Sequence, residues 1–186
     1  MRRRIVVLGF SLLVLAAGIG WLCYHLTRFD HIISQASARN GVDFYLVKAL
    51  IFEESWFRPD ILGPSGEVGL MQITAAAAAD FSARKGFPPF YEARLFEPEL
   101  NVEIGCWYLH QSLERYKHSP EPTVFALLRY NAGEVRTDQW LRLVLAKPAP
   151  AGMSEERYCL SLVDYPKTRD YVRRILQRAR SRNFWF

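Results

Sequence analysis

The sequence predicts an all-α (mainly α) protein in which one N-terminal transmembrane helix precedes a helical domain. The first observation is a run of 20 residues without a charge, from Ile5 to Tyr24, directly after three arginines. At ~1.5 Å per residue this run spans about 30 Å, the thickness of a bilayer core. The second observation is that apolar residues recur at helical spacing in the downstream segments, which Gly and Pro separate. We therefore expect a membrane segment over residues 1–28 and a folded domain over residues 29–186.

The composition narrows the class of protein. Half of the 186 residues are hydrophobic and 14% are aromatic, so the chain can bury a core. The 24 basic residues include the arginines at positions 2–4, and the other 21 nearly balance 19 acidic residues, which argues against nucleic acid as a partner. The four histidines lack metal-ligand spacing, so we expect no metal site. Cys106 is either a buried small hydrophobe or a disulfide partner of Cys159.

The N-terminal run has two interpretations. A cleavable signal peptide has an apolar region of only ~7–15 residues that ends at small residues, and Ala16, Ala17 and Gly18 offer such a site. The run continues apolar beyond them, however, and Trp21 and Tyr24 are typical of a membrane interface. An uncleaved signal anchor is therefore favoured, in a single-pass inner-membrane protein whose domain faces the periplasm. The alternative is a periplasmic protein after signal cleavage.

The helices of the domain have recognisable signals in chain order. A short amphipathic helix ends at Gly41, and Asp43 is a good N-cap for a helix over residues 44–55. An alanine-rich helix is expected over residues 73–84. A longer helix opens near Pro98.

That longer helix carries two residues with predicted structural roles. For Asn101, a buried hydrogen-bonding role is favoured over a catalytic one. Gly105 costs about 1 kcal/mol against Ala inside a helix, so it is expected to permit close helix packing.

Glu54 is the candidate catalytic residue. It continues an apolar helix face at i, i+3, i+4, i+7 spacing, whose earlier members are Val47, Leu50 and Ile51. Glu53 points about 100° round the helix. Near a helix C-terminus the dipole disfavours a negative charge and partial burial acts the same way, so the expected pKa of Glu54 is raised, as a general acid requires. The alternative is that Glu54 turns to solvent at a frayed helix end.

The stretch around Glu54 resembles the signature of the soluble lytic transglycosylases, members of the lysozyme superfamily that cleave peptidoglycan. The matching elements are Glu54-Ser55, Pro59, Pro64, Gly66 and Gly69-Leu70-Met71-Gln72. Two later strings, FALLRYNAG and TRDYVRRIL, resemble further elements of the family. The resemblance covers roughly residues 30–180. It implies a lysozyme-like transglycosylase domain after the N-terminal transmembrane helix.

The resemblance also implies a reaction. Glu54 would act alone, protonating the β-1,4 glycosidic oxygen between N-acetylmuramic acid and N-acetylglucosamine, then accepting the proton of the muramic C6 hydroxyl as a 1,6-anhydro ring closes. The implied substrate-binding residues are Ser55, Met71, Gln72, Tyr130 and Asn131, with Tyr130 close to the carboxyl group. No metal or organic cofactor is implied. The expected partners are peptidoglycan glycan strands and, through the N-terminal helix, the inner membrane, while a role in an envelope-spanning machine stays open.

The sequence departs from the family pattern beside this site. Gly63 stands where serine is common, and Glu67 replaces a usual alanine. We expect Glu67 to be a solvated loop carboxylate. One alternative is a lysozyme-like muramidase in which Glu67 or Asp60 positions a water molecule. A second is a catalytically weak peptidoglycan-binding module, although the intact polar groups of the motif argue against it.

Overall fold

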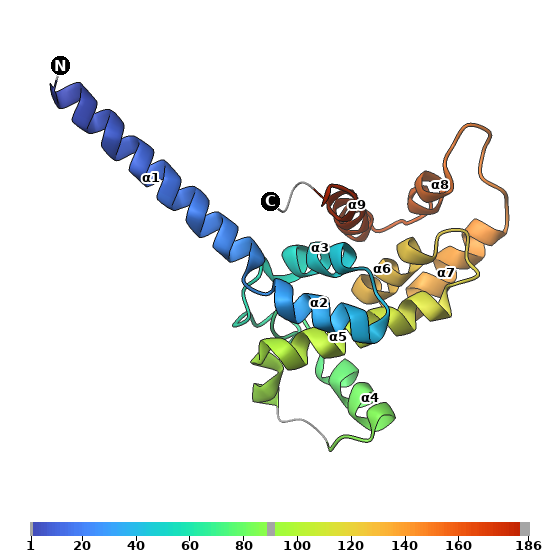
Figure 1. Ribbon diagram of the computed structural model, residues 1–186. Helices are drawn as coiled ribbons and strands as arrows, with labels where there is room; N and C mark the ends of the chain where they lie inside the picture. The colour runs from blue at the N-terminus through green and yellow to red at the C-terminus, as the bar shows by residue number, and fades with distance from the viewer. Residues whose placement is uncertain (1, 89–91, 183–186) are drawn as a thin grey trace.

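The computed structural model describes residues 2–88 and 92–182, and these are mainly helical (Figure 1). The helix α1, Arg2–Thr27, leaves the domain as a long rod. Within the described residues there is no strand, only two isolated bridges, Leu62–Val68 and Val68–Ile73. The prediction of an all-α domain behind an N-terminal apolar helix is therefore confirmed.

Eight further α-helices and one 3₁₀ helix are described in the domain. In chain order they are α2 Asp30–Asn40, α3 Phe44–Ser55, α4 Ala75–Lys85, η1 Glu92–Phe96, α5 Pro98–Arg115, α6 Pro122–Ala132, α7 Glu134–Leu145, α8 Glu155–Ser161 and α9 Pro166–Arg180.

The helix ends follow from local capping. The Asp43 side chain accepts a hydrogen bond of 2.8 Å from the backbone N–H of Leu46, so α3 begins where the sequence predicts. The alanine-rich helix α4 begins two residues later than expected. Thr74 caps it by accepting from the backbone N–H of Ala77 at 3.1 Å, while Ile73 is held in a bridge with Val68.

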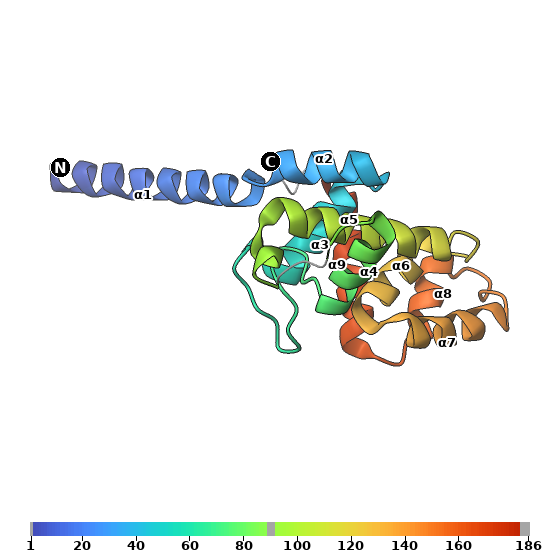
Figure 2. The ribbon, with the colours of Figure 1, turned by 90° about the horizontal axis from the view of Figure 1, so that it is seen from below.

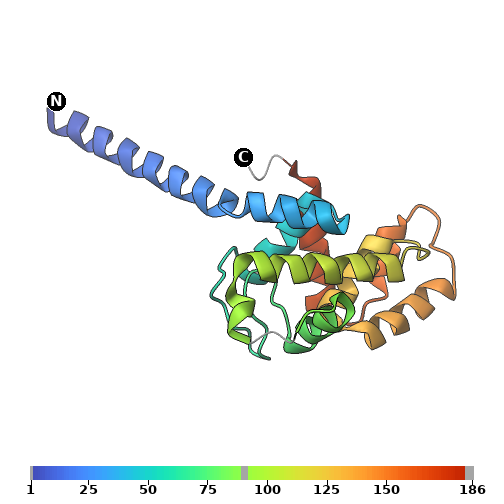
Figure 3. The same cartoon turned by 60° about the horizontal axis from the view of Figure 1, so that its bottom comes forward.

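The helix α5 lies across the middle of the domain, where it contacts α2, α4 and α6 (Figure 3). Gly105 on this helix lets the Met71 side chain approach. A Cβ atom added at Gly105 would lie 2.7 Å from Met71 Cε and 2.9 Å from Met71 Cβ. The close packing predicted at Gly105 is confirmed, but its partner is the loop before α4 rather than another helix.

The end of α1 is fixed to the domain just behind α3. The buried His25 ring pairs through Nε2 with the Trp56 carbonyl oxygen at 2.8 Å, and Arg28 donates from Nη2 to the Phe57 carbonyl at 2.6 Å. Figure 2 shows the rest of α1 extending away from the other helices. Within the described residues, the helical stretch Phe10–Asn40 is long and apolar enough to cross a membrane, a test that a signal sequence also passes.

Candidate active site

Glu54 lies in the last turn of α3, at the edge of the core. The three apolar residues that precede it on this helix face, Val47, Leu50 and Ile51, are fully buried, and the Glu54 side chain is half-buried. The helix ends directly afterwards because Trp56 takes a left-handed conformation with φ of 51°. The apolar stripe and the helix end predicted around Glu54 are confirmed.

Burial raises the pKa of Glu54 from 4.5 to about 7. The Tyr171 phenol donates a hydrogen bond to Glu54 Oε1, which acts in the opposite direction because it stabilises the carboxylate. The charges of Glu53 and Glu67 raise the pKa further. A carboxyl group balanced in this way holds a proton near neutral pH and can release it, as acid and base catalysis by one group requires.

Two tyrosines stand beside this carboxyl group. Tyr171 from α9 contacts it directly, and the Tyr130 hydroxyl donates a hydrogen bond of 2.8 Å to the Met71 carbonyl. Tyr108 packs edge-on against Tyr130 with ring centroids 5.6 Å apart. Burial, followed by the charge of Glu54, raises the pKa of both Tyr130 and Tyr171 well above 10, so both phenols remain neutral donors.

Glu53 also faces α9 but is held in a separate ion-pair cluster. Its carboxylate accepts hydrogen bonds from the guanidinium groups of Arg174 and Arg178, and its side chain is 12% exposed. Both oxygens of the Glu53 carboxylate are therefore engaged by arginines. The two adjacent acids have different surroundings, as their helix phase predicts.

The predicted substrate-binding residues fall into two groups. Ser55 and Met71 are buried, and the Ser55 hydroxyl donates to the Leu70 carbonyl at 2.8 Å. Both side chains pack inside the domain, and a role for these two residues in substrate binding stays a prediction. Gln72 and Tyr130 are half-buried, and Asn131 is exposed. These three side chains lie at or near the surface, and their contact with substrate stays a prediction.

Long-range hydrogen bonds hold the loop and helix ends around the site. Asn101 is fully buried and bonds three backbone groups, those of Met71, Val68 and Leu95, so its predicted structural role is confirmed. Asn131 Oδ1 accepts a hydrogen bond of 2.7 Å from Thr168, which joins the end of α6 to the start of α9. The first turn of α9 is thereby fixed next to Tyr130 and Asn131, which are predicted to line the site.

The loop between Glu54 and Gln72 brings two polar side chains close to Gly63. The Glu67 carboxylate folds back and accepts a hydrogen bond of 2.9 Å from the backbone N–H of Ser65. A Cβ atom at Gly63 would lie 2.5 Å from Glu67 Oε2 and 2.6 Å from Gln72 Oε1. A serine at position 63 would therefore require the ends of the Glu67 and Gln72 side chains to shift. The Glu67 side chain is half-buried, and the expectation of a solvated loop carboxylate stays a prediction.

The possible further centres of chemistry are groups of metal-ligating side chains and the two buried cysteines. Over residues 2–88 and 92–182, no three His, Cys, Asp or Glu side chains are grouped to hold a metal ion. Cys106 and Cys159 are both free thiols. Burial raises the pKa of Cys106 to about 12 and that of Cys159 to about 11, so both are unreactive at neutral pH.

Sequence reasoning missed the role of Tyr171. The string TRDYVRRIL contains it, but nothing local indicates that this tyrosine meets Glu54 across 117 residues. The same helix supplies Arg174 and Arg178 to Glu53. A basic helix face is ordinarily solvated, so the inward contacts of this one become visible only in the fold.

This geometry defines a class: an all-α domain with one proton-holding glutamate at a helix end. The sequence model of the Transglycosylase SLT domain family matches residues 31–150, and the chain belongs to this family. The chain is 32% identical over 111 residues to the membrane-bound lytic murein transglycosylase F of Desulfosudis oleivorans. It is 30% identical over 129 residues to the soluble lytic murein transglycosylase of Salmonella typhimurium.

These alignments cover most of this chain but only about a fifth of each relative. The two alignments span 58% and 69% of this chain but 22% and 19% of the relatives. An inactive mutant of the lytic transglycosylase Slt from Pseudomonas aeruginosa superposes with a TM-score of 0.70 at 25% identity, covering 82% of this chain and 23% of that one. The lysozyme-like fold expected from the resemblance is confirmed.

Proposed function

We propose that this protein is a peptidoglycan lytic transglycosylase in which Glu54 serves as both acid and base. The observation that carries the proposal is a single half-buried carboxyl group with a pKa of about 7, held by Tyr171, in a domain of the Transglycosylase SLT family. The matched relatives are named lytic murein transglycosylases, which supports peptidoglycan as the substrate.

The reaction can be balanced with one carboxyl group. Protonated Glu54 gives its proton to the glycosidic oxygen, which leaves as the 4-hydroxyl group of N-acetylglucosamine. The muramic C6 oxygen then bonds to C1 of the same sugar, and its proton returns to Glu54. No water is consumed, and the enzyme ends with the proton it began with. Tyr171 holds one oxygen of the carboxyl group, which leaves the other free for the proton transfer.

The alternative function, a lysozyme-like muramidase, depends on whether a neighbouring carboxylate can act as a second catalytic group. An inverting hydrolase needs a second carboxylate that acts as base on a water molecule. Glu53 is paired with two arginines and is unsuited to this role. Glu67 is the candidate that a muramidase would use, because its charge acts on Glu54. Its bond to the Ser65 backbone N–H, which a water-activating base would have to share, favours the transglycosylase.

We also propose that α1 anchors the domain at the periplasmic face of the inner membrane. The helix carries apolar side chains from Phe10 to Leu22 that the domain leaves exposed. The His25 and Arg28 contacts fix the domain directly beyond this stretch. Basic residues at positions 2–4 favour a cytoplasmic N-terminus. Residues 1–28 would then be the anchor and residues 29–186 the catalytic domain.

The test is digestion of purified peptidoglycan sacculi by the wild-type chain and by three variants, followed by mass spectrometry of the soluble fragments. Glu54→Gln should release nothing, while Glu53→Gln and Glu67→Ala should still release fragments with 1,6-anhydromuramic ends. Reducing muramic ends as the main product would assign a muramidase. Equal loss of activity in Glu54→Gln and Glu67→Ala would make Glu67 a second catalytic group.

A further inference from the structure

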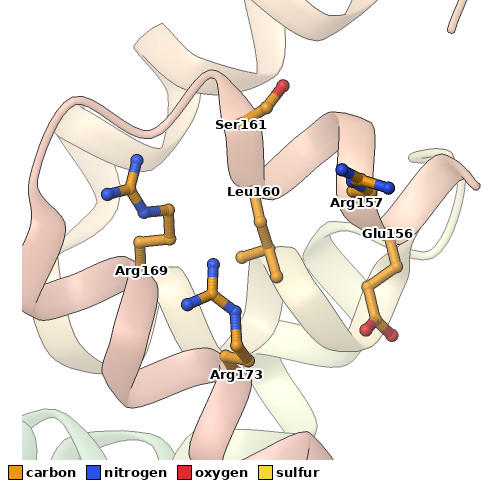
Figure 4. Close-up of a pocket in the computed structure, with 6 residues that line it drawn as sticks. All are labelled: Glu156, Arg157, Leu160, Ser161, Arg169 and Arg173. Carbon is orange, nitrogen blue, oxygen red and sulfur yellow. The ribbon is translucent and has the colours of Figure 1, made fainter. Parts of the chain in front are cut away.

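A hollow of about 460 Å³ lies between α8 and the first turns of α9 (Figure 4). Its lining residues are Glu156, Arg157, Leu160, Ser161, Arg169 and Arg173. Figure 4 shows Arg169 and Arg173 reaching from α9 on one side of Leu160 and Arg157 standing on the other. Three guanidinium groups therefore surround an apolar floor.

The positive charge of this hollow is only partly compensated. Glu156 is paired with Arg180, and Arg173 pairs with Asp170 at 2.8 Å on its own helix. Within residues 2–88 and 92–182, neither Arg157 nor Arg169 has a carboxylate partner. Arg169 is half-buried, so its charge is less exposed to water than that of an ordinary surface arginine. Two guanidinium groups without a carboxylate partner among the described residues are thus available to an anion.

The hollow is separate from the proposed catalytic site. Residues 169 and 173 are two positions on either side of Tyr171, so they project from the opposite face of α9 to the phenol that contacts Glu54. A group bound between α8 and α9 would therefore contact the face of α9 opposite to the one that carries Tyr171. It could not itself be the sugar undergoing cleavage.

The lining selects the chemistry of the ligand. Guanidinium groups bind carboxylate and phosphate in a bidentate manner. The Leu160 floor adds a contact for aliphatic carbon, which a carboxylate carried on a peptide offers and an inorganic phosphate does not. A lipid headgroup is disfavoured because α8 lies at the end of the domain away from α1 in two views (Figures 1 and 2).

We infer that this arginine pocket, defined by Arg157, Leu160, Arg169 and Arg173, binds a carboxylate of a peptide carried by the glycan substrate. The inference rests on the proposed function for its ligand, since the peptide stems of peptidoglycan carry several carboxylates. Binding there would hold a substrate strand against α9 and favour peptide-bearing glycan over bare glycan.

The test compares the wild-type chain with an Arg157→Gln/Arg169→Gln double variant on two substrates. These are intact sacculi and glycan strands stripped of peptide by an amidase. The double variant should lose about tenfold in kcat/KM on intact sacculi, as expected for removal of two charge-assisted hydrogen bonds, and change little on stripped strands. Arg142→Gln/Lys147→Gln, which removes two exposed positive charges outside the pocket, is the charge-matched control.

A binding measurement keeps the inference testable if no cleavage occurs. The Glu54→Gln full chain in detergent is titrated calorimetrically with the tetrapeptide L-alanyl-γ-D-glutamyl-meso-diaminopimelyl-D-alanine. Binding that the double substitution abolishes supports the pocket even if the proposed reaction is wrong. The inference is overturned if the tetrapeptide does not bind, if the double variant binds it equally, or if inorganic phosphate or phosphatidylglycerol micelles displace it at lower concentration.

Discussion

Replacing Glu54 by glutamine should stabilise the folded domain at alkaline pH. Burial raises the pKa of this carboxyl group from 4.5 to about 7, so the folded chain binds the proton more tightly than the unfolded chain does. Between these two values the folded state holds more protons, and its stability therefore falls as the pH rises. Above pH 7 the cost of the ionised carboxylate is fully present.

The size of the effect follows from the pKa. At about 1.4 kcal/mol for each tenfold change in the proton-binding constant, a rise from 4.5 to about 7 corresponds to roughly 3 kcal/mol. Glutamine carries no charge, and its side-chain oxygen can still accept the hydrogen bond from Tyr171. Glu54→Gln should therefore gain up to roughly 3 kcal/mol over the wild type at pH 8, which is about 9 °C in Tm for a chain of this size.

The assay is thermal or urea unfolding of both chains between pH 4 and pH 8, followed by circular dichroism. The two stabilities should agree near pH 4 and diverge between pH 5 and pH 7. Glu53→Gln is the matched control, because removing a carboxylate that pairs with Arg174 and Arg178 should destabilise the domain rather than stabilise it. A constant difference between Glu54→Gln and wild type across this range would refute the raised pKa.

Three further predictions follow from particular contacts. Tyr171→Phe removes a hydrogen bond that stabilises the ionised Glu54 carboxylate. The alkaline limb of the pH–rate profile should therefore move from about pH 7 to a higher pH. A limb that stays in place or moves to a lower pH would show that Tyr171 does not set the pKa of Glu54. Gly105→Ala should lose about 1–3 kcal/mol of unfolding free energy to collision with Met71, offset by up to about 1 kcal/mol of helix propensity, and a stabilised variant in urea unfolding would contradict that contact. N-terminal sequencing of the membrane-extracted protein should find α1 intact, whereas a mature terminus near residues 18–20 would identify a cleaved signal peptide.

Local signals were sufficient for much of the fold. The bounds of α3 follow from Asp43 as N-cap, and the end of α2 follows from Gly41, which takes φ of 64°. The raised pKa of Glu54 also follows from its position on an apolar stripe near a helix end. Each of these features depends on residues within about two helical turns, so periodicity and capping rules reach them.

Features that depend on distant contacts could not be predicted from the sequence. Tyr171 meets Glu54 only because α9 packs on α3. The start of α4 is shifted by the bridge between Ile73 and Val68. No local signal indicates that the Ser55 hydroxyl donates a hydrogen bond to the Leu70 carbonyl, 15 residues along the chain.

The arginine pocket illustrates the same limit. Arg157 and Arg169 stand twelve positions apart on separate helices, and a basic stretch in a sequence indicates no cavity. The hollow arises because α8 and α9 bring these side chains round Leu160 (Figure 4).

The central claim, that Glu54 cleaves glycan without a second carboxylate or a water molecule, is tested most directly by digesting sacculi in ¹⁸O-labelled water. Ring closure by the muramic C6 oxygen predicts fragments whose muramic ends contain no ¹⁸O and are lighter by one water than hydrolysis products. Newly formed reducing muramic ends that carry one ¹⁸O atom at the anomeric carbon would contradict the account, because cleavage creates a reducing end only when a water molecule attacks in place of the C6 hydroxyl.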